Sequence, residues 1–177
     1  MKKFKLDFSF VILLGIISLS PKQNLALKLF LCLFLHELGH LIFVLIFRYK
    51  IHSLKLSIFG FFLELDRTKE VFYKDFFIYL GGILSNLLCY ILIPDPQIKT
   101  MSLILIIFNS LPIYPLDGFN VVKTLAAYIF PYRFVLVGMS YLSLLCSMLS
   151  FLICMYYKMD VFLLINAFYL ILLSIEY

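Results

Sequence analysis

The sequence is poor in charged residues, which make up only 14% of its 177 positions. Hydrophobic residues make up 64%, and the mean hydropathy is +1.06, outside the range of soluble globular domains. This composition excludes a soluble enzyme or binding domain. It predicts an integral, multi-pass membrane protein that lies in the lipid bilayer.

Paired cysteines are also lacking, since no two of the four cysteines form a C-x-x-C pair. A disulfide framework and a thiolate metal site are therefore not expected, and the cysteines are interpreted as packing residues. No small-residue cleavage site of the A-x-A kind follows the first apolar stretch. We therefore expect that stretch to be retained rather than removed as a signal peptide.

No internal repeat, low-complexity linker or charge run divides the sequence, so we expect a single membrane domain over residues 1–177. Apolar stretches that approach the length needed to cross a hydrocarbon core of about 30 Å occur in about six places. They are residues 8–20, 25–47, 76–93, 101–116, 134–157 and 161–175. The expected fold is an all-α membrane protein with about six transmembrane helices.

The net charge of +5 comes from basic residues that gather in the loops. Three lysines precede the first span, and six Lys and Arg residues lie between the second and third spans. The positive-inside rule then places the N-terminus and residues 48–75 in the cytoplasm, and six crossings return the C-terminus there. The charge indicates orientation, and no nucleic-acid partner is expected.

The segment over residues 49–65 differs from the spans because apolar residues alternate with polar ones around Gly60. This pattern predicts a small β-hairpin at the cytoplasmic interface. An exposed strand edge there would be able to accept an extended peptide by strand addition. A strand pair that only covers the helix bundle explains the pattern equally well.

The sequence His36-Glu37-Leu38-Gly39-His40 lies inside the apolar span over residues 25–47. On a helix, His36 and His40 lie one turn apart on one face, close enough to share a metal ion, and Glu37 is a candidate general base. An ionisable group at bilayer depth costs at least about 2.5 kcal/mol unless it is paired. Three such groups together therefore indicate a functional site.

A catalytic zinc site normally has three protein ligands, so a third must come from elsewhere in the chain. Asp117 follows a segment with two prolines, which would break a helix, and broken helices at membrane depth are tolerated where they line a cavity. Counted at 1.5 Å per residue from the non-cytoplasmic side, His36, His40 and Asp117 lie at about 18, 24 and 24 Å. Alternatively, Asp117 only caps a helix over residues 118–130.

The chain resembles the site-2 proteases, intramembrane zinc metalloproteases, and most nearly their sporulation branch, stage IV sporulation protein FB. Three motifs carry the resemblance. Residues 36–40 correspond to H-E-x-x-H, residues 109–118 to N-x-x-P followed by L-D-G, and residues 81–86 to G-P-x-x-N. Gly82 departs from the pattern, because the family often has proline there.

The resemblance implies that His36, His40 and Asp117 bind Zn²⁺ and that Glu37 activates water. It also implies a catalytic core of three helices within about residues 25–130. The CBS and PDZ domains that some relatives carry are lacking in this sequence, so nucleotide-linked control and PDZ-type filtering of substrates are not expected.

By the same resemblance, Asn86 and Asn109 would support the substrate backbone or the transition-state oxyanion. Their alternative role is interhelical hydrogen bonding, which is worth about 1 kcal/mol in membrane bundles.

The sequence thus predicts hydrolysis of a peptide bond in a membrane-associated protein, with release of a product into the cytoplasm. The resemblance suggests a sporulation sigma-factor precursor as substrate and inhibitory membrane proteins as further partners, and it leaves the oligomeric state open. A membrane metal transporter or a noncatalytic metal-binding protein is the alternative, because His and Asp within spans also mark ion pathways. Glu37 favours the protease, since a transport path needs more polar residues stacked along the spans.

Overall fold

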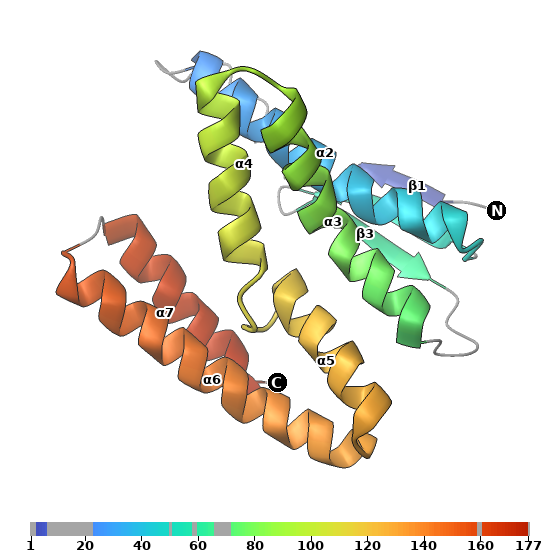
Figure 1. Ribbon diagram of the computed structural model, residues 1–177, viewed down its shortest axis with the longest axis vertical. Helices are drawn as coiled ribbons and strands as arrows, with labels where there is room; N and C mark the ends of the chain where they lie inside the picture. Colours follow the sequence, from blue (N-terminus) through green and yellow to red (C-terminus); the bar gives the residue numbers. More distant parts are fainter. Residues whose placement is uncertain are drawn as a thin grey trace. The chain divides into compact units, whose positions relative to one another are not determined.

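The computed structural model describes residues 3–6, 23–49, 51–57, 60–65, 72–158 and 161–176 (Figure 1). Within these ranges the chain forms helices α2 (Gln23–Ile46), α3 (Phe72–Leu92), α4 (Pro96–Asn109), α5 (Asp117–Ile129), α6 (Tyr132–Tyr156) and α7 (Val161–Glu176). The strands are β1 (Lys3–Leu6), β2 (Ile51–Ser57) and β3 (Gly60–Leu65). The described part is thus mostly helical, as the composition predicts.

Three helices, α2, α3 and α6, are long and apolar enough to cross a membrane. Only 22%, 33% and 17% of their most apolar stretches are buried, so most of this apolar surface faces outward. Helices α4 and α7 have 14 and 16 residues, fewer than the roughly 20 that a span perpendicular to the bilayer needs. The predicted span over residues 8–20 lies outside the described residues, and the total of six spans stays a prediction.

The apolar stretch predicted over residues 101–116 is divided in the structure. Helix α4 ends at Asn109, residues 110–116 form turns, and α5 begins at Asp117. This break agrees with the two prolines, since proline lacks the N–H that a helix interior requires. Helix α4 also begins earlier than predicted, at Pro96. Proline fits the first turn of a helix, and the side chain of the preceding Asp95 caps the helix by accepting a hydrogen bond from the N–H of Gln97.

The described residues belong to two compact units, Met1–Ile106 and Ile107–Tyr177. In the first unit, α2 packs closely against α3. A Cβ atom built on Gly39 would lie 2.2 Å from the carbonyl oxygen of Gly81, and one built on Gly81 would lie 2.6 Å from that of Gly39. Glycine at both positions therefore lets the two backbones touch, as small residues do in membrane helix pairs.

The first unit also contains a three-stranded sheet with the order β1-β2-β3. Strands β2 and β3 are antiparallel, with Leu54 opposite Leu63, within the segment for which a β-hairpin is predicted. Residues 58–59, which join them, lie outside the described residues, and the interfacial location of the hairpin stays a prediction. Strand β1, which pairs in parallel with β2, is not predicted from the sequence, because four residues carry too little pattern to identify a strand.

In the second unit, α6 and α7 pack against each other and α5 packs against α6. Its core contains Phe119 of α5 with Val135 and Met139 of α6. The ring of Tyr114 meets that of Phe119 edge to face, with the ring centroids 5.6 Å apart. The turn that precedes α5 is thereby packed onto the core of this unit.

Candidate metal centre

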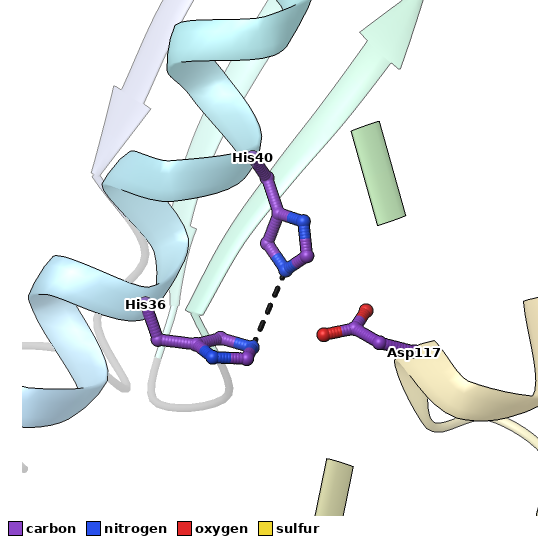
Figure 2. A group of neighbouring side chains, drawn as sticks. All are labelled: His36, His40 and Asp117. Atoms are coloured by element: carbon purple, nitrogen blue, oxygen red, sulfur yellow. Dashed lines mark hydrogen bonds between the residues drawn. The ribbon is translucent and has the colours of Figure 1, made fainter. Parts of the chain in front are cut away.

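The two histidines of the H-E-x-x-H motif lie one turn apart on α2. The side chain of His36 is buried, that of His40 is half-buried, and their Nε2 atoms are 3.3 Å apart (Figure 2). Two imidazole ligands of a tetrahedral zinc ion, each at about 2.0–2.1 Å, would have nitrogens roughly 3.4 Å apart. The spacing of the two nitrogens therefore fits a shared metal ion.

The second ring nitrogen of His40 contacts the backbone of α3. Its Nδ1 lies 2.7 Å from the carbonyl oxygen of Ile78. A carbonyl oxygen only accepts hydrogen bonds, so Nδ1 carries the hydrogen and donates it. In the neutral ring, Nε2 then carries the lone pair that a metal requires.

The second ring nitrogen of His36 contacts the fully buried side chain of Asn86 on α3, with the amide 2.9 Å from Nδ1. The amide nitrogen and oxygen exchange places when the group turns by half a rotation. With the nitrogen facing the ring, Oδ1 of Asn86 is buried with no hydrogen-bond partner among the described residues. With the oxygen facing the ring, Nδ1 of His36 donates to it and Nε2 carries the lone pair. The second arrangement gives Oδ1 of Asn86 a donor and leaves a lone pair on Nε2 of His36.

Gly82 lies directly beside the two rings. A Cβ atom built on it would lie 2.5 Å from Cε1 of His36 and 2.5 Å from Nε2 of His40. Any side chain at this position, including a proline ring, would displace the imidazoles. The departure from the family motif at Gly82 therefore has a structural reason in this chain.

Asp117 is the first residue of α5, and Leu116 rather than Asp117 is the N-cap. This corrects the alternative interpretation of Asp117 as a helix cap, because its backbone is already helical. A carboxylate in a first helical turn is also favoured by the helix dipole. His36 and His40 belong to the first unit and Asp117 to the second, and each offers one atom that can bind a metal, so the three residues are the candidate ligand set (Figure 2).

The remaining predicted site residues lie on α2 and α4. Glu37 follows His36 on α2 and is half-buried, and Asn109 is the last residue of α4. The amino-acid sequence does not predict the role of the Ile78 carbonyl, because a backbone acceptor has no sequence signal. The amide of Asn86 contacts His36 across α3 and α2, which is the kind of interhelical contact given above as its alternative role.

No family model matches this sequence. Among curated proteins, the chain is similar to "Putative zinc metalloprotease sll0528" of Synechocystis sp. (strain ATCC 27184 / PCC 6803 / Kazusa). The two are 26% identical over 155 residues, which cover 69% of this chain and 41% of that protein. The chain thus spans less than half the length of the curated relative that it matches.

Among solved structures, the chain is similar to the Site-2 Protease from Methanocaldococcus jannaschii, with a TM-score of 0.65 and 18% identity. The match covers 99% of this chain and 90% of that one. At this identity the similarity establishes the fold, which is that of the site-2 protease. Both matches and the three apolar helices support a membrane protein.

Proposed function

We propose that this protein is an intramembrane zinc metalloprotease that hydrolyses a peptide bond in a membrane-associated protein. The histidine pair carries this proposal. The Nε2 atoms of His36 and His40 lie 3.3 Å apart on an apolar helix. The Nδ1 atom of each ring contacts a group of α3, and Glu37 follows His36 in the sequence. The fold of the Methanocaldococcus protease and the name of the Synechocystis relative support the same function.

The donor set fits zinc in its catalytic form. His36 and His40 would supply two imidazole nitrogens and Asp117 a carboxylate oxygen, which leaves a fourth tetrahedral position for water or substrate. A zinc ion held by these residues would supply polarisation of the scissile carbonyl and would lower the pKa of water toward about 7.

The chain's own residues perform the proton transfers and the orientation. Glu37 accepts the proton of the attacking water and passes it to the leaving amine. Asn86 and the Ile78 carbonyl hold the rings of His36 and His40 in the tautomer that binds metal. Asn109 is proposed to support the substrate backbone or the transition-state oxygen.

The finer features of the function remain proposals that rest on the sequence. They are membership of the sporulation branch, a sigma-factor precursor as substrate, inhibitory membrane proteins as partners, cytoplasmic termini and release of the product into the cytoplasm.

The test compares the wild type with Glu37→Gln, each co-expressed as the full chain with candidate membrane-tethered precursors. The glutamine keeps the shape of the side chain and removes the base, so we expect the shortened product to fall by about 10²–10⁴-fold. The zinc content of the purified variant should equal that of the wild type. Product is measured on a gel and zinc by atomic absorption.

The matched control is Asp95→Asn, the same carboxylate-to-amide change in the loop before α4, which should leave cleavage unchanged. If Glu37→Gln cleaves like the wild type while zinc is bound, the protease proposal is wrong. A transporter would instead show metal uptake into cells or vesicles and no shortened product.

A further inference from the structure

A turn and two buried serines in the second unit are joined by a continuous chain of hydrogen bonds. The backbone N–H of Tyr114 donates to Oγ of Ser143 on α6 at 2.8 Å, and Oγ of Ser143 lies 2.8 Å from Oγ of Ser174 on α7. Ser174 donates in turn to the carbonyl oxygen of Leu170 at 2.8 Å. The exposed fractions of Ser143 and Ser174 are 0% and 3%.

The direction of this chain follows from the number of hydrogens. A serine hydroxyl has one hydrogen, and that of Ser174 is used toward Leu170, so Ser174 accepts from Ser143. The hydrogen of Ser143 is thereby used as well, and its oxygen accepts from the N–H of Tyr114. Each donor strengthens the next acceptor in a low-dielectric interior.

The first donor of this hydrogen-bond chain, the backbone N–H of Tyr114, belongs to the turn that leads into Asp117. Residues 110–116 are not helical, and their buried N–H groups must find partners outside a regular helix. The turn is also tight against α5, because a Cβ built on Gly118 would lie 2.4 Å from the backbone of Ser110. A shift of Tyr114 therefore moves the first residues of α5.

The next serine along α6 shows that this arrangement is not the usual one. Ser147 is equally buried, at 0%, but it donates to the carbonyl oxygen of Leu144 within its own helix. That bond is the ordinary solution for serine in an apolar helix. Ser143 instead contacts the turn before α5 and the neighbouring helix α7.

We propose that Ser143 and Ser174 are positioning residues that orient Asp117 for metal binding, so that α6 and α7 support the metal centre. This inference rests on the proposed function, because it takes Asp117 as a ligand of zinc. It predicts that loss of one hydroxyl on α6 lowers the affinity for zinc although no ligand is changed.

The experiment measures zinc affinity by competition with a chromogenic chelator, using the purified full-length protein. We expect Ser143→Ala to weaken zinc binding about tenfold, the lower end of the effect seen for groups that orient metal ligands. The matched control Ser147→Ala should stay within about twofold, since the Ser147 hydroxyl donates within α6 itself. Ser143→Thr keeps the hydroxyl and should restore most of the affinity.

A second readout does not involve the metal. Hydrogen exchange of the Tyr114 amide should be faster in Ser143→Ala than in the wild type or Ser147→Ala, because its acceptor is removed. Unchanged exchange of this amide would overturn the inference.

The zinc measurements separate the inference from the function on which it rests. If the wild type binds zinc and Ser143→Ala binds it equally well, the positioning role is wrong and the protease proposal stands. Equal losses in Ser143→Ala and Ser147→Ala would indicate general loosening of α6 and would also overturn it. A wild type that binds no zinc would overturn the proposed function, and the positioning role with it.

Discussion

The rings of His36 and His40, the proposed zinc ligands, are oriented by neighbours that contact the Nδ1 atom of each ring. Ile78 supplies a fixed backbone acceptor, whereas Asn86 supplies an amide that can turn. The amide orientation that satisfies Oδ1 of Asn86 is also the one that leaves Nε2 of His36 ready for a metal. Gly82 completes the arrangement, because it leaves room for both rings.

Substitution of Asn86 tests which group faces His36. Asn86→Ala removes the acceptor and should weaken zinc binding about 10–100-fold. Asn86→Asp keeps an acceptor oxygen opposite Nδ1–H and should bind zinc as tightly as the wild type or more tightly. Chelator competition measures both variants.

The matched control for this pair is Ser102→Ala, which also removes a fully buried polar side chain from the first unit. Ser102 lies against Cys32, 3.7 Å from its Sγ, and should not affect zinc affinity. If Asn86→Asp loses as much affinity as Asn86→Ala, the amide donates to His36 and the tautomer assigned to this ring is wrong.

At the scale of elements, the junction between α3 and α4 is held by one carboxylate. Asp95 accepts hydrogen bonds from the backbone N–H groups of Gln97 and Ile98, and it forms an ion pair with Lys28 of α2. The hydrogen bond from Lys28 is the main reason why the pKa of Asp95 is lower than its ordinary 3.8, and the N–H of Ile98 adds to it.

This lowered pKa gives a pH dependence whose sign is defined. The charged form is favoured in the folded protein, so the contribution is complete above the ordinary pKa and is lost as the pH falls through the lowered value. Asp95→Asn keeps a capping oxygen but loses the ion pair. Its thermal midpoint should lie below that of the wild type at neutral pH, and this gap should close in acid.

Thermal unfolding in detergent from about pH 7 to pH 3 measures the two midpoints. Asp95→Ala, which also lacks the cap, should remain less stable than Asp95→Asn throughout this range. A gap between wild type and Asp95→Asn that widens toward acid would contradict the assignment.

At the scale of the whole molecule, much apolar surface is exposed in the structure. On α6 alone, Leu145, Leu149 and Leu152 are 64%, 58% and 62% exposed. Water would disfavour so much contiguous apolar surface, whereas lipid tails would cover it. A bilayer around α6 therefore explains why its apolar residues are not buried inside the protein.

Replacement of an exposed leucine distinguishes lipid from water. Leu145→Lys near the middle of α6 should disfavour membrane insertion by about 2.5–3.5 kcal/mol. In water, the same exposed change would alter stability by only about 0.5 kcal/mol. Insertion is measured by glycosylation mapping of the two ends of α6.

Tyr156→Lys is the control for this substitution, because it lies at the end of α6 and is 81% exposed. A lysine there can extend to the membrane surface and should be tolerated. Equal insertion of Leu145→Lys and the wild type would indicate that α6 does not lie in lipid.

The sequence by itself determined the features that depend on composition and local spacing. Apolar runs indicate the membrane, the four-residue spacing places His36 and His40 on one helix face, and two prolines end α4 before Asp117. Each of these follows from neighbours along the chain, so a periodic pattern or a steric rule is sufficient. Such rules predict the start of α4 and the cap of α5 only to within a few residues.

Only the tertiary structure decided which groups hold the ligands. Asn86 is separated by 50 residues from His36, and Ser143 by 29 from Tyr114. Nothing in the sequence distinguishes Ser143 from Ser147, since both are serines on one apolar helix. Contacts between distant segments depend on how the helices pack, which brings a backbone carbonyl, an amide and a hydroxyl to positions that no local pattern specifies.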